Sequence, residues 1–292
     1  DLQGLDALFQ RYLKSRARTP SGIWSLSVAN AALSSAVVGE VARGSSWPVE
    51  LEAARRWASA SPTSPVAQMA PARALLSQAW SVRGPGPAKS VSSADMAEFL
   101  RLTKQANASL RLVKPMSARD PSWYEMAVSI DLYLGRPLSE SESSFLEAVA
   151  KEPEYLQTYF VMSRRFDPHW GGSADSLEAF VVQATAQLTG SARDTTYLRI
   201  YWWAIELGYF DDLNDSRMDC VRMMIGARAV VREYPDRWNT NKLAKLAGAC
   251  GDRESAKYFL TLIPGPPLMA AWGDPSGAER SYTRFRTWLE AK

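Results

Sequence analysis

The sequence predicts an all-α fold, a stack of antiparallel helix pairs, and three observations lead to this prediction. Apolar residues recur at helical spacing along most of the 292-residue chain. The segments between prolines and glycines are mostly about 12 to 20 residues long, which is the usual length of helices in globular proteins. Strand signals are nearly absent, because there is no Asn-Gly hairpin and there are few alternating runs of β-branched residues.

The overall composition is that of a globular protein and excludes several classes of function. Hydrophobic residues make up 46% of the chain and charged residues 22%. The 34 basic and 31 acidic residues give a net charge of +3, which is too even to favour nucleic-acid binding. No stretch approaches the roughly 18 to 20 uncharged apolar residues of a membrane span. The longest candidate, residues 195–210, contains Arg199 and Glu206, so we expect no membrane-spanning segment.

Four helices are expected in the first 84 residues. The second covers an apolar run at about 22–42, and the third has Pro48 near its N-terminus, a position that proline tolerates well. The fourth, at about 64–83, contains Pro71, which predicts a kink or a late start. The first, at about 2–16, has one apolar stripe: Leu2, Leu5, Leu8, Phe9, Tyr12 and Leu13.

The stretch "GPGPAKSVSS" at 84–93 is the clearest interruption of this pattern. It predicts an N-terminal helical part, residues 1–84, and a helical-repeat part, residues 93–292. The alternative is one continuous domain in which 84–93 is only a loop. The stretch does not predict a phosphate-binding loop, because its prolines lack the N–H groups that such a loop uses.

Helices then follow in pairs to the end of the chain. A helix at about 93–115 precedes a pair at 121–137 and 138–153, in which Gly135 and Pro137 end the first helix and Ser139 caps the second. Further pairs are expected at 154–166 with 173–190, and at 193–210 with 213–235. Residues 236–267 form the last pair, and 279–290 form a closing helix.

The stretch "NKLAKLAGACGDRESAKYFLTLIP" resembles a tetratricopeptide-type repeat, two antiparallel helices joined by a tight turn. The resemblance implies that Gly251 and Asp252 form the turn. It places Leu243 and Ala244 on the first helix and Ala256 where the two helices cross closely.

A second copy is implied at "WYEMAVSIDLYLG" and "FLEAVAKEPEY", with Gly135 at its turn. Because the spacing is irregular, the resemblance implies a degenerate helical repeat over about 120–263. The chain as a whole also looks like a bacterial family of helical-repeat proteins of unknown function. That family implies a fold but no catalytic residues. It is similar in "SWYEMA" and in a P-x-W-G-G-S element, here Pro168, Trp170, Gly171, Gly172 and Ser173.

The single histidine, His169, lies in "DPHWGGS". One histidine excludes a His-rich metal site, and we predict no metal and no cofactor. The stretch predicts a corner between helices, because the residue before Pro168 avoids helical geometry and Ser173 can cap the next helix. In this interpretation Trp170 packs back onto the corner, and a binding role for His169 and Trp170 is the weaker alternative.

Cys220 and Cys250 are too few for a disulfide framework, and their separation matches no metal motif. The favoured interpretation is two buried thiols. The alternative is one bridge between neighbouring helices, which would support export. The chain begins with Asp1 rather than methionine, which also slightly favours an exported or periplasmic protein over a cytoplasmic one.

Aromatic residues are abundant, with 11 Trp, 11 Tyr and 9 Phe. Adjacent aromatics on one helix cannot all point the same way, so we favour aromatics that fill helix–helix interfaces. The functional alternative is a concave surface that grips a peptide or protein. Its candidate residues, together with the corner, are His169, Trp170, Arg199, Tyr201, Trp202, Trp203 and Tyr209.

The fold class favours binding over catalysis, and no catalytic residue is assigned. The leading hypothesis is a non-enzymatic protein–protein interaction module whose partner is another protein or a peptide. It would act as an adaptor, a scaffold or an inhibitor, for example one that neutralises a bacterial toxin. One alternative is a small-ligand binder with an aromatic groove. Another is a hydrolase or lyase acting on cell-wall glycan through paired carboxylates, from Glu140, Glu142, Asp211, Asp212 and Asp215.

Overall fold

The computed structural model describes residues 2–210 and 213–291. Within these ranges it contains fifteen α-helices, five short 3₁₀ helices and no β-strand, which confirms the all-α prediction. The chain divides into two compact units. Unit 1 comprises residues 1–17 and 24–165, and unit 2 comprises residues 18–23 and 166–292.

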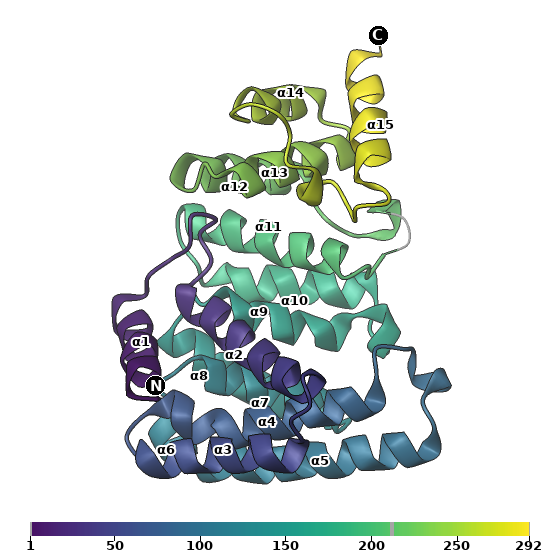
Figure 1. Cartoon of the computed structure of the whole chain (residues 1–292). Coiled ribbons are helices and arrows are strands. Elements are labelled where there is room, and N and C mark those ends of the chain that lie inside the picture. Colours follow the sequence, from purple (N-terminus) through teal and green to yellow (C-terminus); the bar gives the residue numbers. More distant parts are fainter. Residues whose placement is uncertain (1, 211–212, 292) are drawn as a thin grey trace. The chain divides into compact units, whose positions relative to one another are not determined.

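Unit 1 contains nine α-helices among its described residues. Helices α3, α4 and α5 lie side by side (Figure 1), and α7 packs against α5, α8 and α9. The α-helices of unit 1 are α1 (Leu2–Ser15), α2 (Ser25–Ala42), α3 (Trp47–Ala60), α4 (Pro65–Arg83), α5 (Ser93–Leu112), α6 (Lys114–Ser117), α7 (Ser122–Tyr133), α8 (Leu138–Lys151) and α9 (Leu156–Ser163).

The breaker cluster at 84–93 lies inside unit 1. It joins α4 to α5 and contains a short 3₁₀ helix, η1 (Ala88–Ser90). The two compact units therefore differ from the division at 84–93 that the sequence suggests. Prolines and glycines mark the end of a helix, but they do not show whether the next helix packs back on the same core, as α5 does on α4.

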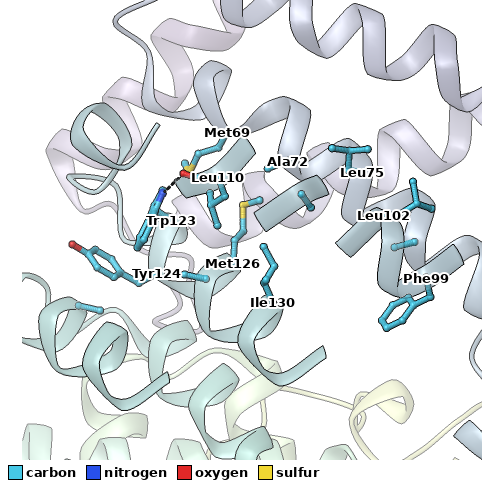
Figure 2. Packing of buried hydrophobic residues seen from close by; sticks show 14 residues of the cluster. Met69, Ala72, Leu75, Phe99, Leu102, Leu110, Trp123, Tyr124, Met126 and Ile130 are labelled. Atoms are coloured by element: carbon cyan, nitrogen blue, oxygen red, sulfur yellow. Dashed lines mark hydrogen bonds between the residues drawn. The ribbon is translucent and has the colours of Figure 1, made fainter. Parts of the chain in front are cut away.

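The main core of unit 1 lies between α4, α5 and α7 (Figure 2). Trp123 is fully buried there, and its indole N–H donates a 3.0 Å hydrogen bond to the carbonyl of Leu110. A buried tryptophan needs such an acceptor, so this bond fixes α7 against the end of α5. The labelled core residues are Met69, Ala72, Leu75, Phe99, Leu102, Leu110, Trp123, Tyr124, Met126 and Ile130.

Unit 2 stacks consecutive helices against one another. Helix α11 packs on α10 and α12, and α13 packs on α12 and α14, which is the succession of neighbouring helices that the sequence predicts. The α-helices of unit 2 are α10 (Ala174–Ala186), α11 (Ser191–Glu206), α12 (Cys220–Glu233), α13 (Arg237–Ala249), α14 (Arg253–Thr261) and α15 (Ala278–Glu290), with 3₁₀ helices η3 (Pro168–Trp170), η4 (Leu213–Asp215) and η5 (Met269–Ala271). Another 3₁₀ helix, η2 (Arg164–Phe166), lies where the chain passes from unit 1 to unit 2.

The expected turn between α13 and α14 is present. Gly251 has a φ of +69°, and the Asp252 side chain caps α14 by accepting a 2.9 Å hydrogen bond from the Ser255 N–H. Ala256 is fully buried, as expected for a small residue where helices approach closely. Gly135, with a φ of +63°, forms the turn between α7 and α8. The tetratricopeptide type of the repeat itself stays a prediction.

One local prediction in unit 1 is wrong, and one alternative of another is excluded. Helix α8 begins at Leu138 with Pro137 at the N-cap, so Ser139 lies within the first turn and does not cap it. Helix α4 begins at Pro65 and continues through Pro71, which excludes the late start, and the kink at Pro71 stays a prediction. The Ser64 side chain caps this helix by accepting a hydrogen bond from the Ala67 N–H, and this fixes the start before Pro71.

The favoured interpretation of the cysteines is also wrong, because Cys220 and Cys250 form a disulfide with their Cα atoms 5.7 Å apart. Neither residue is fully buried. Cys220 is the first residue of α12, and Cys250 directly follows the last residue of α13. A short connection between consecutive packed helices brings the start of the first close to the end of the second.

Helix α2 alone among the described helices has the length and composition of a membrane crossing, with a mean hydropathy of 1.3 over 18 residues. With Glu40 as its only charged residue, α2 is a better candidate than residues 195–210, which contain Arg199 and Glu206. One such helix near the N-terminus is weak evidence, so the described residues contain no clear membrane span. What is unusual is its exposure, because only 17% of this helix is buried.

Candidate functional site

The candidate site is an open groove of about 800 Å³ in unit 1. Residues from α2, α4 and α7 line it, together with the turn that follows α4. This groove combines apolar walls with two partly buried charged groups, Arg73 and Glu125. The lining residues are Ser34, Ser35, Val38, Gly39, Ala42, Arg73, Leu76, Ser77, Trp80, Ser81, Gly84, Pro85, Glu125, Met126, Ser129 and Tyr133.

Helix α2 supplies one wall of this groove. Its residues are mainly alanine, serine and valine, and just three of them, Leu26, Ser27 and Asn30, are buried. Val28 is 50% exposed and Val38 is 45% exposed. A helix that is apolar on all sides is normally buried, so α2 leaves an apolar surface open to solvent.

Aromatic side chains supply the opposite wall and are held rigidly. The ring of Trp80 packs edge-on against Tyr133 and Phe99, with centroid distances of 5.1 and 5.4 Å. The guanidinium of Arg83 lies 4.9 Å from the Trp80 ring, and Arg164 donates a 2.9 Å hydrogen bond to the Tyr133 hydroxyl. These contacts fix the rings, so the wall is already formed before anything binds.

Arg73 brings a positive charge to the groove. Its guanidinium donates to the side-chain oxygen of Asn30 at 2.6 Å and to the Ser34 hydroxyl at 3.2 Å. Its Nε is buried and has no hydrogen-bond partner. Among the described residues, no carboxylate lies within ion-pair distance of Arg73 (4.0 Å). Burial lowers the pKa of Arg73, and the neighbouring Glu125 and Asp120 oppose this effect.

Glu125 is the acidic group in the groove. It accepts a 3.0 Å hydrogen bond from the Tyr155 hydroxyl, and burial raises its pKa. Asp120 lies nearby but serves the start of α7, where it accepts hydrogen bonds from the Ser122 N–H at 2.9 Å and the Ser122 hydroxyl at 2.6 Å. The groove therefore offers one cation, one carboxyl group, several hydroxyls and apolar walls, a set suited to holding an amphipathic group.

The structure places most of the predicted binding residues inside unit 2 and not in this groove. Tyr201, Trp202 and Tyr209 are buried, and Trp203 is half-buried. Arg199 is also buried, with its guanidinium 4.8 Å from the Trp202 ring. These positions match the favoured interpretation of aromatics that fill helix–helix interfaces, and they give no support to an exposed aromatic grip.

Arg199 and its neighbours form a buried polar network. Arg199 donates to the Ser21 carbonyl at 2.6 Å and to the Asn239 side-chain oxygen at 3.3 Å. Burial lowers the pKa of Arg199 to about 10, which leaves it charged at neutral pH. Tyr201 donates a 2.5 Å hydrogen bond to Glu178, and burial raises its pKa. The bonds of Arg199 and of Tyr201 all lie within unit 2, so both sets hold that unit together.

The His169 stretch forms the expected corner. His169 is 67% exposed in its side chain, and its Nδ1 lies 2.9 Å from Asp167. Trp170 is half-buried, and the next residue, Gly171, has a φ of +88°. Ser173 caps α10 by accepting a 3.1 Å hydrogen bond from the Ser176 N–H. A binding role for His169 or Trp170 stays a prediction.

Three of the acids named from the sequence, Glu140, Glu142 and Asp215, do not line the groove. Glu140 is exposed and forms an ion pair with Arg136 at 3.2 Å, and Glu142, two residues later on α8, is also exposed. Asp215 lies in η4, while Asp211 and Asp212 lie outside the described residues.

Sequence reasoning missed Arg73, Trp80, Glu125 and Tyr133. Arg73 and Glu125 are too far apart in the chain for any spacing rule to connect them. The one available signal is the composition of α2, an apolar helix with a single charge.

Comparisons with family models, curated proteins and solved structures find no match to this chain. Within the described residues there is also no group of three or more His, Cys, Asp or Glu side chains that could hold a metal ion. The groove is therefore assigned as the candidate site from the geometry of this chain alone.

Proposed function

We propose that the protein is a non-enzymatic binding module that holds an amphipathic segment of a protein partner in the groove between α2, α4 and α7. The observation that carries this proposal is the exposed apolar face of α2 along a preformed groove. Exposed apolar side chains beside a preformed hollow are typical of interaction sites in soluble proteins. An adaptor, a scaffold or an inhibitor would each use such a groove.

The lining indicates the chemistry of the partner segment. Val38, Leu76 and Trp80 favour apolar side chains, in the way that a hydrophobic groove accepts one face of an amphipathic helix. Arg73 favours a carboxylate among them, because it is a cation without an ion-pair partner in the described chain. We therefore expect a segment with two or three apolar anchors and one acidic side chain.

Selection from a random peptide library tests this function directly. Peptides that bind the full chain should fail to bind a Ser77→Trp variant, in which a large side chain fills the groove from α4. Ser143→Trp is the matched control, because Ser143 is exposed on α8 and does not line the groove. We expect the affinity of these peptides for Ser77→Trp to be at least roughly tenfold lower, as when one binding anchor is lost. Equal binding to both variants would exclude the groove.

The acidic group can be tested on the peptide, which avoids disturbing Arg73. Replacing glutamate by glutamine in a selected peptide should weaken binding by roughly fivefold or more, since a charge-assisted hydrogen bond is lost. If the change has no effect on affinity, then Arg73 does not contribute to recognition.

A small amphiphilic molecule is a second candidate ligand, and the volume of the groove favours it. Small-molecule sites usually have volumes of roughly 300 to 1,000 Å³, and this groove has about 800 Å³. Native mass spectrometry of the purified protein would reveal a retained ligand that Ser77→Trp does not retain. If such a ligand is found and the peptide library yields no binder, the small ligand is favoured over a protein partner.

A further inference from the structure

A second hollow of about 800 Å³ in unit 1 is lined mainly by basic side chains. Four cations line it, Arg111, Lys114, Arg119 and Lys151, and Glu147 is the only acid in the lining. The formal charge of the lining is therefore +3, equal to the net charge of the whole chain. This concentration distinguishes the hollow from the rest of a surface in which the two signs are nearly balanced.

Three segments position these groups independently. Arg111 lies in the last turn of α5, and Lys114 begins the short helix α6. Arg119 follows α6. Glu147 and Lys151 lie four residues apart on α8, which places them on the same face of that helix. The charges therefore converge because of how α5, α6 and α8 pack, not because they are adjacent in sequence.

Glu147 organises two of the cations but cannot neutralise the hollow. It accepts hydrogen bonds from Lys114 at 2.7 Å, from Lys151 at 3.0 Å and from the Tyr124 hydroxyl at 2.6 Å. These partners lower its pKa to about 2, so it stays ionised at neutral pH. One carboxylate shared by two ammonium groups leaves an excess of positive charge.

The two arginines add to this excess. Arg111 lies 3.2 Å from Asp131, but Asp131 also pairs with Arg136 at 3.0 Å. Arg119 is exposed and donates to the carbonyl of Thr63 at 2.6 Å, an acceptor that carries no net charge. Each arginine therefore retains N–H groups and charge for a ligand.

We propose that this basic hollow binds a multiply charged oxyanion, such as the phosphate or diphosphate group of a small ligand. Lysine ammoniums bind such groups as point charges, and arginine adds paired hydrogen bonds. The rings of Trp123 and Tyr124, beneath the cations, are buried and offer no face for stacking. The hollow therefore recognises charge and not a base or a sugar ring.

Titration calorimetry of the full chain with inorganic pyrophosphate at low salt tests the proposal. Arg119→Gln and Lys114→Gln should each weaken binding by about tenfold, which corresponds to losing one charged hydrogen bond. The matched control is Arg101→Gln, because Arg101 is exposed on α5 and pairs with Glu98 outside the hollow. No binding to the wild type at millimolar pyrophosphate, or equal weakening by the control, would overturn the proposal.

Two further experiments identify the source of the anion and show whether the basic hollow binds it independently of the groove. Vesicles that contain phosphatidic acid should bind through Arg119 if the phosphate belongs to a lipid headgroup, and pyrophosphate should then compete with them. Binding of pyrophosphate without vesicle binding indicates a soluble ligand. Ser77→Trp, which fills the groove of the proposed function, should leave pyrophosphate binding unchanged. A loss in that variant would contradict a separate anion site.

Discussion

At the scale of single residues, the half-buried Glu147 shows how one ion network makes stability depend on pH. Its folded pKa of about 2 lies below the ordinary value of 4.5, because Lys114, Tyr124 and Lys151 stabilise the charged form. A lowered pKa contributes stability that is present above 4.5 and is lost as the pH falls towards 2. The side chain is 37% exposed, so solvent screening keeps the contribution to about 1 kcal/mol.

We therefore predict that Glu147→Gln lowers the free energy of unfolding by about 1 kcal/mol at pH 7. The difference from wild type should shrink as the pH falls from 4.5 towards 2. Chemical denaturation across this range measures it. Glu254→Gln is the control, since Glu254 is 92% exposed and should change stability little at any pH. A difference that is constant with pH would contradict the assigned ion network.

Gly171 and Gly172, the two glycines of the His169 corner, allow backbone strain and steric collision to be compared at adjacent positions. Gly171 has a φ of +88° with open space around it, while a Cβ on Gly172 would collide with the backbone of Phe166. We predict that Gly171→Ala costs about 1 kcal/mol, the strain of a left-handed residue. Gly172→Ala should cost about 3 kcal/mol, because the backbone has to move. Thermal unfolding compares them. Equal effects would show that the approach of Phe166 is not tight.

At the scale of elements, the disulfide between Cys220 and Cys250 links the start of α12 to the end of α13 and should stabilise unit 2. It closes a loop with a sequence separation of 30, for which chain entropy gives roughly 3.5 kcal/mol of stabilisation. Replacing both cysteines by serine should lower the free energy of unfolding by about that amount. A reductant should destabilise the wild type and leave the double variant unchanged. If the wild type does not respond to the reductant, the bridge does not stabilise unit 2.

Helix positions could be predicted from the sequence because periodicity, caps and breakers are local signals. Such signals predict the Ser173 cap and the all-α class, while the Gly251 turn is implied by the resemblance to a tetratricopeptide-type repeat. The groove could not be predicted, because periodicity shows which residues are apolar but not which helix covers them. Helix α2 illustrates this limit, since its composition predicts burial while the structure leaves it largely exposed. Arg73 and Glu125 line the same groove because α4 and α7 share one hydrophobic core.

At the scale of the whole molecule, the two units do not follow the order of the chain. Residues 18–23 belong to unit 2, although the helices on either side of them, α1 and α2, belong to unit 1. The Ser21 carbonyl accepts hydrogen bonds from Arg199 at 2.6 Å and from Asn239 at 3.2 Å. Nothing in the sequence indicates this arrangement, because a short loop near the N-terminus carries no signal of its distant partners. Unit 2 therefore depends on a segment far upstream of its helices.

Gly22 allows this dependence to be measured. Its φ is +87°, and an added Cβ would lie 2.7 Å from the ring of Tyr234. We predict that Gly22→Ala destabilises the protein by about 3 kcal/mol, combining left-handed strain with overpacking. In a double-mutant cycle, Tyr234→Ala should remove the overpacking but not the strain, so the two effects will fall short of additivity by about 1 kcal/mol or more. Chemical denaturation of the four proteins gives this coupling. Strict additivity would mean that Gly22 does not pack on Tyr234, and the hydrogen bonds to the Ser21 carbonyl would then be the contacts that tie the segment to unit 2.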